Sequence, residues 1–320
     1  MTINQLRPSY KDYLWGGQKL KENYGKKTDL NPLAESWEVS THPDGPSYIL
    51  GGPHDGLTLK AYLEEKNQAP LGTKGQTFDR FPVLVKFIDA LGELSIQVHP
   101  NDEYGFKHEN EYGKTEMWYI LEAEPGAKVY YGTKEPISKE AFKQSIEDQT
   151  VLDKLNHVAV KKGDVIFVEA GTIHAIGKGI VLCEVQQNSN TTYRVYDYHR
   201  KDAEGNLRDL HIDKALDVAT LTPLNTDFEP AEVAKTYENH TKQLLASSSY
   251  FNVQKVEVGG SFTQSISKES FKSITVIEGS ITFEDNNHSL TLNKGESAFI
   301  DAGSQHIKTD GPGTYLSVSV

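Results

Sequence analysis

The chain has 320 residues, enough for about two ordinary domains, and 37% of them are hydrophobic, as in globular proteins rather than disordered chains. A formal net charge of −12 argues against nucleic acids and anionic membrane surfaces as partners, since affinity for both depends on clustered Lys and Arg. The chain has neither an apolar run long enough to span a membrane nor a signal-peptide pattern, and its single cysteine, Cys183, excludes an internal disulfide, so we expect a cytoplasmic protein.

The first predicted element is a short helix at residues 58–65. The next is a strand that holds Gln97 and His99, two residues apart, so both side chains point to one face while Ile96 and Val98 point to the other. An inward-facing pair of polar side chains is costly unless something satisfies it. This strand is therefore the first candidate for a binding site.

A second strand is predicted at residues 117–121, which are rich in aromatic and aliphatic side chains. Glu116 immediately precedes this run. Lys114 comes two residues earlier, so we expect it to share the face of Glu116. A carboxylate and an ammonium group are thus predicted to point into the same cavity.

Two further stretches are predicted to be helical. Residues 138–155 begin with serine and place apolar side chains among charges at helical spacing, which indicates one or two amphipathic helices. Residues 209–221 have an acidic start and place Leu and Ala near one face, which indicates another helix. Prolines and polar residues cluster at residues 222–239, where we place the link between two modules.

The chain also contains an internal repeat. Residues 162–174 align without a gap with residues 294–306, and Lys, Gly, Phe, Ala, Gly and His coincide. Each copy reads as a turn, a short apolar strand, a tight Ala-Gly turn and a second strand that begins near a histidine, His174 or His306. Such similarity indicates two copies of one structural unit. Many short strands broken by Gly, Pro, Asn and Asp favour a barrel or jelly roll.

Four side chains form the candidate metal site. Gln97, His99, Glu116 and His174 offer two imidazoles, a carboxylate and an amide oxygen. Such ligands suit zinc, or else iron, manganese or nickel, with positions left for water or substrate. The alternative is that the four are separate polar residues, each satisfied by its own hydrogen bonds.

The same residues carry a resemblance to the cupin superfamily. Residues 163–174 resemble the second cupin motif, and Gln97, His99 and Glu116 resemble the first. Within the cupins, residues 95–101 and 113–117 resemble type I mannose-6-phosphate isomerases, especially the short bacterial form. The match extends through residues 15–17, 35–43, 81–86 and 187–194.

The resemblance implies a mainly β protein made of two cupin (jelly-roll) β-barrels with a few short helices. Residues 1–235 would form the metal-binding catalytic domain and residues 236–320 a metal-free cupin domain. The implied activity is the interconversion of mannose 6-phosphate and fructose 6-phosphate by a zinc-assisted enediol mechanism. One Zn²⁺ per chain would be held by Gln97, His99, Glu116 and His174. We expect a sugar phosphate as the partner, and a monomer or weak homodimer.

The resemblance also assigns roles to three cations. Arg194 and Lys114 would be catalytic, and Lys86, Lys114 and Arg194 would bind the substrate. Alternatively, Lys86 extends to solvent from a strand end, and Arg194 is a structural ion-pair partner. The proton-carrying base stays open, because Asn190 stands where larger family members have Asp. The candidates are a zinc-bound hydroxide, Glu38, Lys114 and His99.

The second copy is predicted to lack a metal. In the repeat alignment Lys272 occupies the position of Glu116, and a cation there opposes metal binding. His306 remains, but a lone histidine is more often a hydrogen-bonded structural residue than a ligand. Two other functions would fit a cupin: a metal-dependent oxygenase, or a non-catalytic protein that binds a sugar phosphate.

Overall fold

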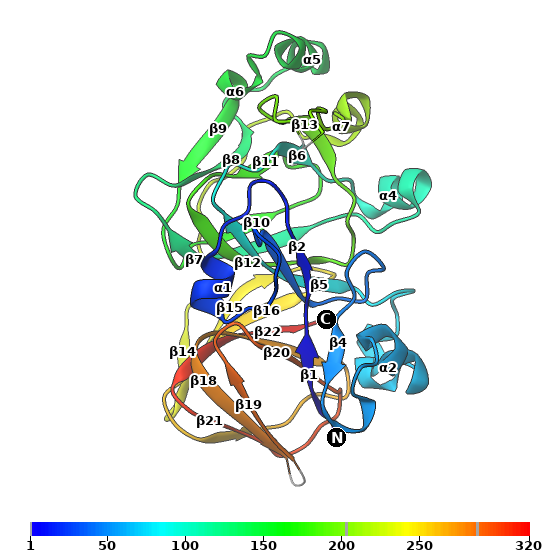
Figure 1. The fold of residues 1–320 in the computed structure, drawn as a ribbon, viewed down its shortest axis with the longest axis vertical. Coiled ribbons are helices and arrows are strands. Elements are labelled where there is room, and N and C mark those ends of the chain that lie inside the picture. The colour runs from blue at the N-terminus through cyan, green and yellow to red at the C-terminus, as the bar shows by residue number, and fades with distance from the viewer. Residues whose placement is uncertain (1, 202–203, 286–287) are drawn as a thin grey trace.

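The computed structural model describes residues 2–201, 204–285 and 288–320. The fold is mainly β, as predicted, with short helices around three sheets (Figure 1). Within the described residues the hydrogen-bonded strand orders are open, and none of the three sheets closes on itself. The expectation of mainly β structure is therefore confirmed, whereas the arrangement into two closed barrels is not.

The first two sheets face each other and form what we call the first unit. The six-stranded sheet contains β10 (Val165–Val168), β7 (Glu116–Ala123), β12 (Ile180–Gln187), β5 (Val83–Ala90), β3 (Glu35–Val39) and β2 (Ser9–Lys11), in that order. The five-stranded sheet contains β13 (Tyr193–Tyr196), β6 (Ile96–Val98), β11 (His174–Ile176), β8 (Lys128–Thr133) and β9 (Leu155–Ala159). Apolar side chains from both sheets, such as Ile120 and Val129, share one core.

The third sheet has eleven strands and forms most of the second unit. Its main path is β14 (Lys235–Thr236), β15 (His240–Ser247), β16 (Asn252–Val258), β22 (Gly313–Ser319), β18 (Lys272–Asp285), β20 (Ser297–Ile300), β1 (Ile3–Arg7) and β4 (Tyr48–Leu50). Beside this path lie β17 (Phe262–Gln264), β19 (His288–Asn293) and β21 (Ile307–Asp310). Because β1 pairs with β20, the two ends of the chain share one sheet (Figure 1).

Strand pairing reproduces the sequence repeat. In the first unit β7 lies between β10 and β12, and in the second unit β18 lies between β20 and β22. Glu116 pairs with Val168, and Lys272 pairs with Ile300, which is the residue aligned with Val168. Both units also have an irregularity at the corresponding point of the next strand pair, just after Ile120 and Val276. The repeat thus extends to the register of the strands.

Glycines of the repeat stand where the chain turns tightly. Gly171 and Gly303 have φ values of +91° and +79°, in the left-handed region that other residues rarely adopt. Gly171 also donates its N–H to the carbonyl oxygen of His99 at 2.8 Å, which fixes the turn that precedes His174. The Ala-Gly turn predicted from the sequence therefore positions a candidate ligand.

The predicted helices are confirmed with small changes at their ends. Helix α2 (Leu59–Glu65) is capped by Thr58, and the stretch 138–155 forms α5 (Lys139–Glu147) and α6 (Val151–Lys154) before β9 begins. Helix α7 (Ile212–Val218) is shorter than the predicted 209–221. The sequence did not predict α1 (Lys19–Tyr24), α3 (Gly72–Gly75), α4 (Asp102–Glu109) or the 3₁₀ turns η1 (Gly52–His54) and η2 (Ala69–Leu71). In the described part of the chain, no helix combines the length and apolar character needed to cross a bilayer.

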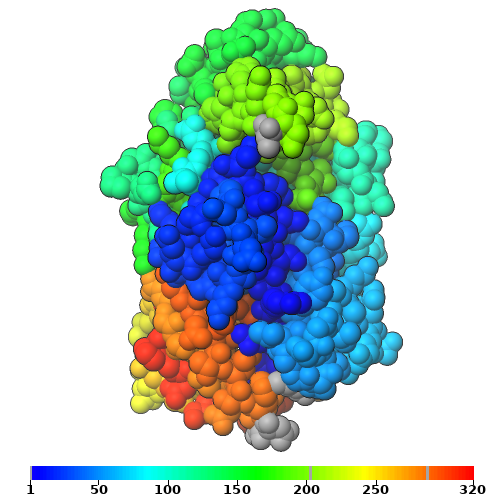
Figure 2. All heavy atoms as spheres, in the orientation of Figure 1, coloured from blue at the N-terminus to red at the C-terminus, as the bar shows by residue number. Residues whose placement is uncertain are grey.

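An apolar interior joins the two units. One face of the six-stranded sheet, which includes Phe87 and Cys183, packs against Phe271, Phe299 and Leu316 of the second unit. Cys183 is fully buried there, as expected of a small hydrophobic side chain. The N-terminal segment lies across the visible junction between the units (Figure 2). The opposite face of the same sheet is left to build the candidate site.

Candidate metal centre and active-site cavity

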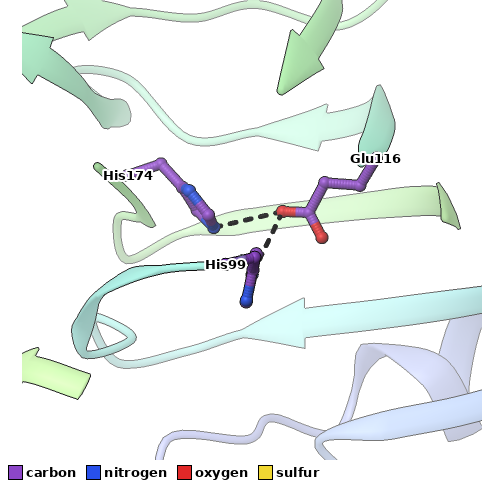
Figure 3. A group of neighbouring side chains, drawn as sticks. All are labelled: His99, Glu116 and His174. Atoms are coloured by element: carbon purple, nitrogen blue, oxygen red, sulfur yellow. Dashed lines mark ion pairs between the residues drawn. The ribbon is translucent and has the colours of Figure 1, made fainter. Parts of the chain in front are cut away.

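Three predicted metal ligands converge in the first unit. His174 begins β11, Glu116 begins β7 and His99 directly follows β6 (Figure 3). Glu116 Oε1 lies 3.1 Å from His174 Nε2 and 3.7 Å from His99 Nε2. Their ligand atoms all lie within 4.8 Å of one another, and the three side chains are buried. The geometry suits a single metal ion.

Backbone carbonyls orient both histidines. Nδ1 of His99 lies 2.9 Å from the carbonyl oxygen of Thr191, and Nδ1 of His174 lies 2.9 Å from that of Thr172. A proton on each Nδ1 leaves the lone pair of Nε2 directed at Glu116, and this is how ligating histidines are held in metalloproteins. The two imidazoles are thus oriented as ligands by the fold itself.

Burial and neighbouring charges also set the protonation states that a metal requires. Burial, followed by the charge of Lys114, lowers the pKa of His99 well below its usual value. Burial opposes the ionisation of Glu116, but the charges of Lys114 and His99 outweigh it and lower its pKa well below the usual range. A neutral imidazole and an ionised carboxylate are the ligand forms that bind divalent metals.

Two further side chains border this cluster. Lys114 Nζ lies 3.0 Å from His99 Nε2 and 2.9 Å from Glu116 Oε2, so its ammonium group faces the carboxylate as predicted. Gln97 Nε2 lies 3.4 Å from His174 Nε2. A half-turn of this amide would bring its carbonyl oxygen to the same position, because the two ends are alike in size. Gln97 can therefore supply a fourth ligand.

A row of charged and aromatic side chains crosses the six-stranded sheet beside the cluster. Lys86 on β5 is the register partner of both Trp37 on β3 and Glu184 on β12, and Glu184 is in turn the partner of Trp118 on β7. Lys86 is 4% exposed and lies 3.7 Å from Glu35 Oε2 and 3.5 Å from Glu184 Oε1. It therefore does not extend to solvent from a strand end.

Each of the two carboxylates that flank Lys86 accepts a hydrogen bond from an indole N–H. Trp37 donates to Glu35 at 2.7 Å, and Trp118 donates to Glu184 at 2.9 Å. The Oε1 atom of Glu184 is buried and has no hydrogen-bond partner among the described residues. Burial, and then the charge of Glu116, raises the pKa of Glu184. Trp118 is thus both a core residue and a support for this carboxylate.

These side chains line a cavity of about 260 Å³. Gln97 and Lys114 connect it to the metal-ligand cluster, and Lys86, Glu35 and Glu184 form one wall. The lining also includes Trp15, Asn190, Arg194 and Arg208. The cavity is large enough for a small polar molecule that reaches the cluster.

Arg194 lies on β13 at this cavity and is a register partner of Gln97. Its Nη1 donates to the carbonyl oxygen of Asp209 at 2.7 Å, while its buried Nε has no hydrogen-bond partner among the described residues. It makes no ion pair with a carboxylate within 4 Å in the described ranges, which argues against the structural ion-pair alternative. Arg194 therefore lines the cavity without a carboxylate within ion-pair distance among the described residues.

Comparisons with known proteins identify the family of the chain. The chain is 37% identical over 321 residues to the mannose-6-phosphate isomerase ManA of Bacillus subtilis, and the match covers 97% of each chain. The chain belongs to the type I mannose-6-phosphate isomerase family. A model of the type I phosphomannose isomerase catalytic domain matches residues 3–151, and a model of the mannose-6-phosphate isomerase cupin domain matches residues 240–320.

Other family members are similar over most of their length. A mannose-6-phosphate isomerase of Streptococcus mutans is 40% identical over 78% of this chain and 76% of its own. The crystal structure of the Bacillus subtilis mannose 6-phosphate isomerase superposes with a TM-score of 0.92 at 33% identity, covering all of both chains. A putative mannosephosphate isomerase from Archaeoglobus fulgidus has the same fold, with a TM-score of 0.79 at 22% identity over 99% of this chain and 96% of that one.

Sequence reasoning within the family pattern missed two carboxylates of the cavity, Glu35 and Glu184. The sequence carries a signal for Glu184, because a charged residue inside the apolar run 180–185 of a central strand is anomalous unless it has a partner. Its partner, Lys86, sits in the similarly apolar run 83–88. Two opposite charges in two buried strands predict that the strands are neighbours.

Glu38, a candidate base from the sequence, lies on the opposite face of β3. It is fully buried and accepts hydrogen bonds from Lys26, Ser36 and Ser297. Lys26 also donates to the carbonyl oxygen of Gly295, which belongs to the second unit. Because strand residues alternate in direction, Glu35 and Glu38 end up with separate roles: the first lines the cavity, and the second ties the units together.

Proposed function

We propose that this protein interconverts mannose 6-phosphate and fructose 6-phosphate and that it holds one zinc ion per chain. The observation that carries the proposal is the convergence of His99, Glu116 and His174 beside a cavity lined by paired and unpaired cations. Family membership supports the reaction, because the relatives are named mannose-6-phosphate isomerases. The oxygenase alternative has no support from the comparisons.

The donor set fits zinc. Two neutral imidazoles and a carboxylate are common zinc ligands, and a protein amide can complete the set while leaving room for substrate. Glu116 is fully buried, and neither of its carboxylate oxygens accepts a well-aligned hydrogen bond in the described part of the chain. Lys114 supplies one cation at Oε2, and a metal ion on the side of Oε1 and the two histidines would satisfy the other oxygen. We therefore propose His99, Glu116 and His174 as ligands, with Gln97 as the fourth.

The reaction needs a base, a cation and a means of holding the phosphate. A proton leaves C2 of the open-chain aldose, a proton is added to C1, and a hydroxyl proton moves from O2 to O1, so the atoms balance without any oxidant. A bound zinc ion would supply Lewis-acid polarisation of the substrate oxygens. We propose Glu184 as the group that carries the proton, because it lines the cavity and its Oε1, though ion-paired with Lys86, accepts no hydrogen bond among the described residues.

The cations act around this carboxylate. Lys86 holds Glu184 and Glu35 in place through ion pairs, and Lys114 lies at the entrance to the metal cluster. Both can donate hydrogen bonds to substrate hydroxyls. Arg194 has a planar guanidinium that keeps its proton, which suits it to the negative charge of an enediolate or a phosphate. We propose Arg194 and Lys114 as catalytic residues, and Lys86 as a substrate-binding residue with both.

We also propose that each unit is a cupin, with residues 1–235 as the metal-binding catalytic domain and residues 236–320 as a metal-free domain. The shared strand register of β7 and β18 supports this division. Strands β1 and β4 are exceptions to this division, because they belong to residues 1–235 but pair within the third sheet. Cytoplasmic location and a monomer or weak homodimer stay predictions. Sedimentation at two concentrations would test the oligomeric state.

A coupled assay tests the function. Fructose 6-phosphate formation from mannose 6-phosphate is measured before chelation, after chelation and after zinc is added back. We expect chelator-sensitive turnover that zinc restores. A protein that holds one metal and binds the sugar phosphate but shows no turnover would instead support the non-catalytic reading. Iron content with oxygen uptake would support the oxygenase.

A further inference from the structure

The cations that line the cavity differ in how they are paired. Lys86 and Lys114 are each ion-paired with a carboxylate. Arg194 and Arg208 line the same cavity. Among the described residues, Arg194 has no carboxylate within ion-pair distance, and Arg208 has only Asp197. The two arginines are therefore the cavity cations that carboxylates of the wall balance least.

Asp197 holds Arg208 in a fixed orientation. Arg208 donates from Nε to Oδ2 at 2.7 Å and from Nη2 to Oδ1 at 2.6 Å, which is a two-point contact. Asp197 is only 5% exposed, and it also accepts hydrogen bonds from Arg200. One carboxylate is thus shared by two guanidinium groups, and this cluster keeps a net positive charge.

Arg194 and Arg208 also act on each other. Both side chains line the same cavity, and burial, followed by the charge of Arg208, lowers the pKa of Arg194. Burial opposes the ionisation of Asp197, but the hydrogen bonds from Arg208 and Arg200 outweigh it and lower its pKa. The carboxylate therefore stays charged and keeps Arg208 in place beside Arg194. Two like charges held together in this way are stabilised by an anion between them.

We propose that Arg208, oriented by Asp197, binds the phosphate group of the hexose 6-phosphate together with Arg194. This inference rests on the proposed function and identifies the residues that take the phosphate. The phosphate is attached at C6, so its capture by the arginines leaves C1 and C2 free to approach Lys114 and the proposed metal ligands. Nη1 of Arg208 makes no hydrogen bond within the described ranges, so it is available to donate to an anion in the cavity that Arg208 lines with Arg194. Asp197 is a positioning residue.

The first experiment compares Arg208→Gln with wild type in steady-state kinetics and in competitive inhibition by inorganic phosphate. The variant loses the charged contact between Arg208 and the phosphate. This loss is expected to raise KM for mannose 6-phosphate and the Ki of phosphate about 10- to 100-fold, with a smaller change in kcat. Arg7→Gln on β1 is the control, since it removes the same charge from an exposed position outside the cavity. Unchanged KM and Ki in Arg208→Gln would overturn the proposal, as would equal effects in both variants.

Further variants separate positioning from folding. Asp197→Asn is expected to raise KM while bound zinc and kcat stay near wild type, whereas a merely structural role would lower the melting temperature and leave KM unchanged. If Arg208→Gln does not fold, Arg208→Lys decides, because lysine keeps the charge but cannot make the two-point contact. A raised KM in this variant supports the proposal, and a wild-type KM and Ki reject it.

Direct calorimetry with inorganic phosphate keeps this inference distinct from the proposed function. If the wild-type protein showed no isomerase turnover, the proposed function would fail. Weaker phosphate binding by Arg208→Gln than by wild type would then still establish the anion site. Equal binding by the two proteins would reject the site, whatever the outcome for turnover.

Discussion

Across the six-stranded sheet of the first unit, neighbouring strands carry Lys86, Glu184 and Trp118 side by side. The same strand pairs in the second unit carry Gln254, Ser317 and Ile274. The second row has no charge, and apolar residues such as Ile274 and Tyr315 fill the interior around it. The backbone pattern is common to both units, so the chemistry depends on a few substituted side chains.

The candidate ligands differ in the same way. Glu116 is buried against two histidines, whereas the corresponding residue of β18 is Lys272. His174 is fully buried, whereas His306 is exposed and has a φ of +56°. A left-handed backbone at this point accompanies a side chain outside the interior. That the second unit binds no metal stays a prediction, and the exposure of His306 shows only that this histidine is not buried as His174 is.

Replacing the histidines one at a time should give the largest contrast between the units. His174→Ala removes a metal ligand, so we expect loss of bound zinc and a fall in turnover of at least about 10³-fold. His306→Ala is the matched control from the repeat, and it should retain both. Metal analysis and the coupled assay measure the two effects. Zinc retained by His174→Ala, or lost by His306→Ala, would contradict the assignment.

The next largest effect is expected at the charged row. Glu184→Gln keeps the size of the side chain and its hydrogen bond from Trp118 but cannot accept a proton, so kcat should fall about 10²- to 10⁴-fold. Bound zinc should be unchanged, because Glu184 is not a proposed ligand. Ser317→Ala, at the corresponding place in the second unit, should keep kcat near wild type. A near-normal kcat in Glu184→Gln would remove Glu184 as the base.

The candidate metal ligands could be proposed from the sequence because local patterns expose them. Gln97 and His99 share a strand face, and His174 follows a turn that the repeat makes visible. No comparable motif marks Glu184 or Arg208. The charge of Glu184 is anomalous within its apolar run, but its partner Lys86 lies on another strand, and Asp197, the partner of Arg208, lies 11 residues away in the sequence. The positions of their side chains depend on strand order and loop path. Neither strand order nor loop path can be predicted from the spacing of residues that are close in the sequence.

The fold shows the same limit. Helices α2 and α5 could be predicted from their caps and apolar spacing. Helix α4 could not, because Gly105 is its only buried residue and the helix therefore has no apolar stripe. The pairing of Ile3 with Ile300 joins residues almost a full chain length apart, and the residues next to them in the sequence do not indicate it. Strand pairs between distant parts of the chain therefore could not be predicted from local sequence patterns.

The junction between the units offers a third test, on stability rather than turnover. Glu38→Gln removes one charge of the buried pair with Lys26 and leaves an unpaired ammonium group in the interior, so the free energy of unfolding should fall by about 3 kcal/mol. Because Glu38 faces away from the cavity, kcat of the folded enzyme should stay near wild type. Urea unfolding and the coupled assay measure the two quantities.

The exposed pair of Lys60 and Glu64 on α2 provides the control for this junction test. Glu64→Gln should leave stability unchanged within error, since exposed pairs contribute little. If Glu38→Gln lost activity without losing stability, Glu38 would return as a candidate base. The contrast would then lie between the two faces of β3 rather than between the two units.

The smallest expected effect lies at Lys272, the counterpart of Glu116. Burial, and then the charge of Lys242, lowers the pKa of Lys272 to about 8, and its ammonium group hydrogen-bonds to Ser319 at 3.2 Å. Between pH 8 and the usual lysine pKa of about 10.5, the unfolded chain binds more protons at this site than the folded one. Stability contributed by this site should therefore rise with pH across that window. Below pH 8 the folded protein carries the full cost of the buried charge.

Lys272→Met removes that cost, so we expect the free energy of unfolding at pH 7 to increase by about 1–2 kcal/mol. The rise in stability between pH 8 and 10 should also become flatter, which chemical unfolding at several pH values would measure. Lys268→Met, at an exposed site in the same unit, should change neither quantity. A destabilised Lys272→Met would mean that the lysine has a favourable partner, and the second unit would then hold its own charged site rather than the remnant of one. A stabilised variant would show that the charge of Lys272 destabilises the second unit. The residue at the same strand position of the first unit, Glu116, is by contrast a proposed metal ligand.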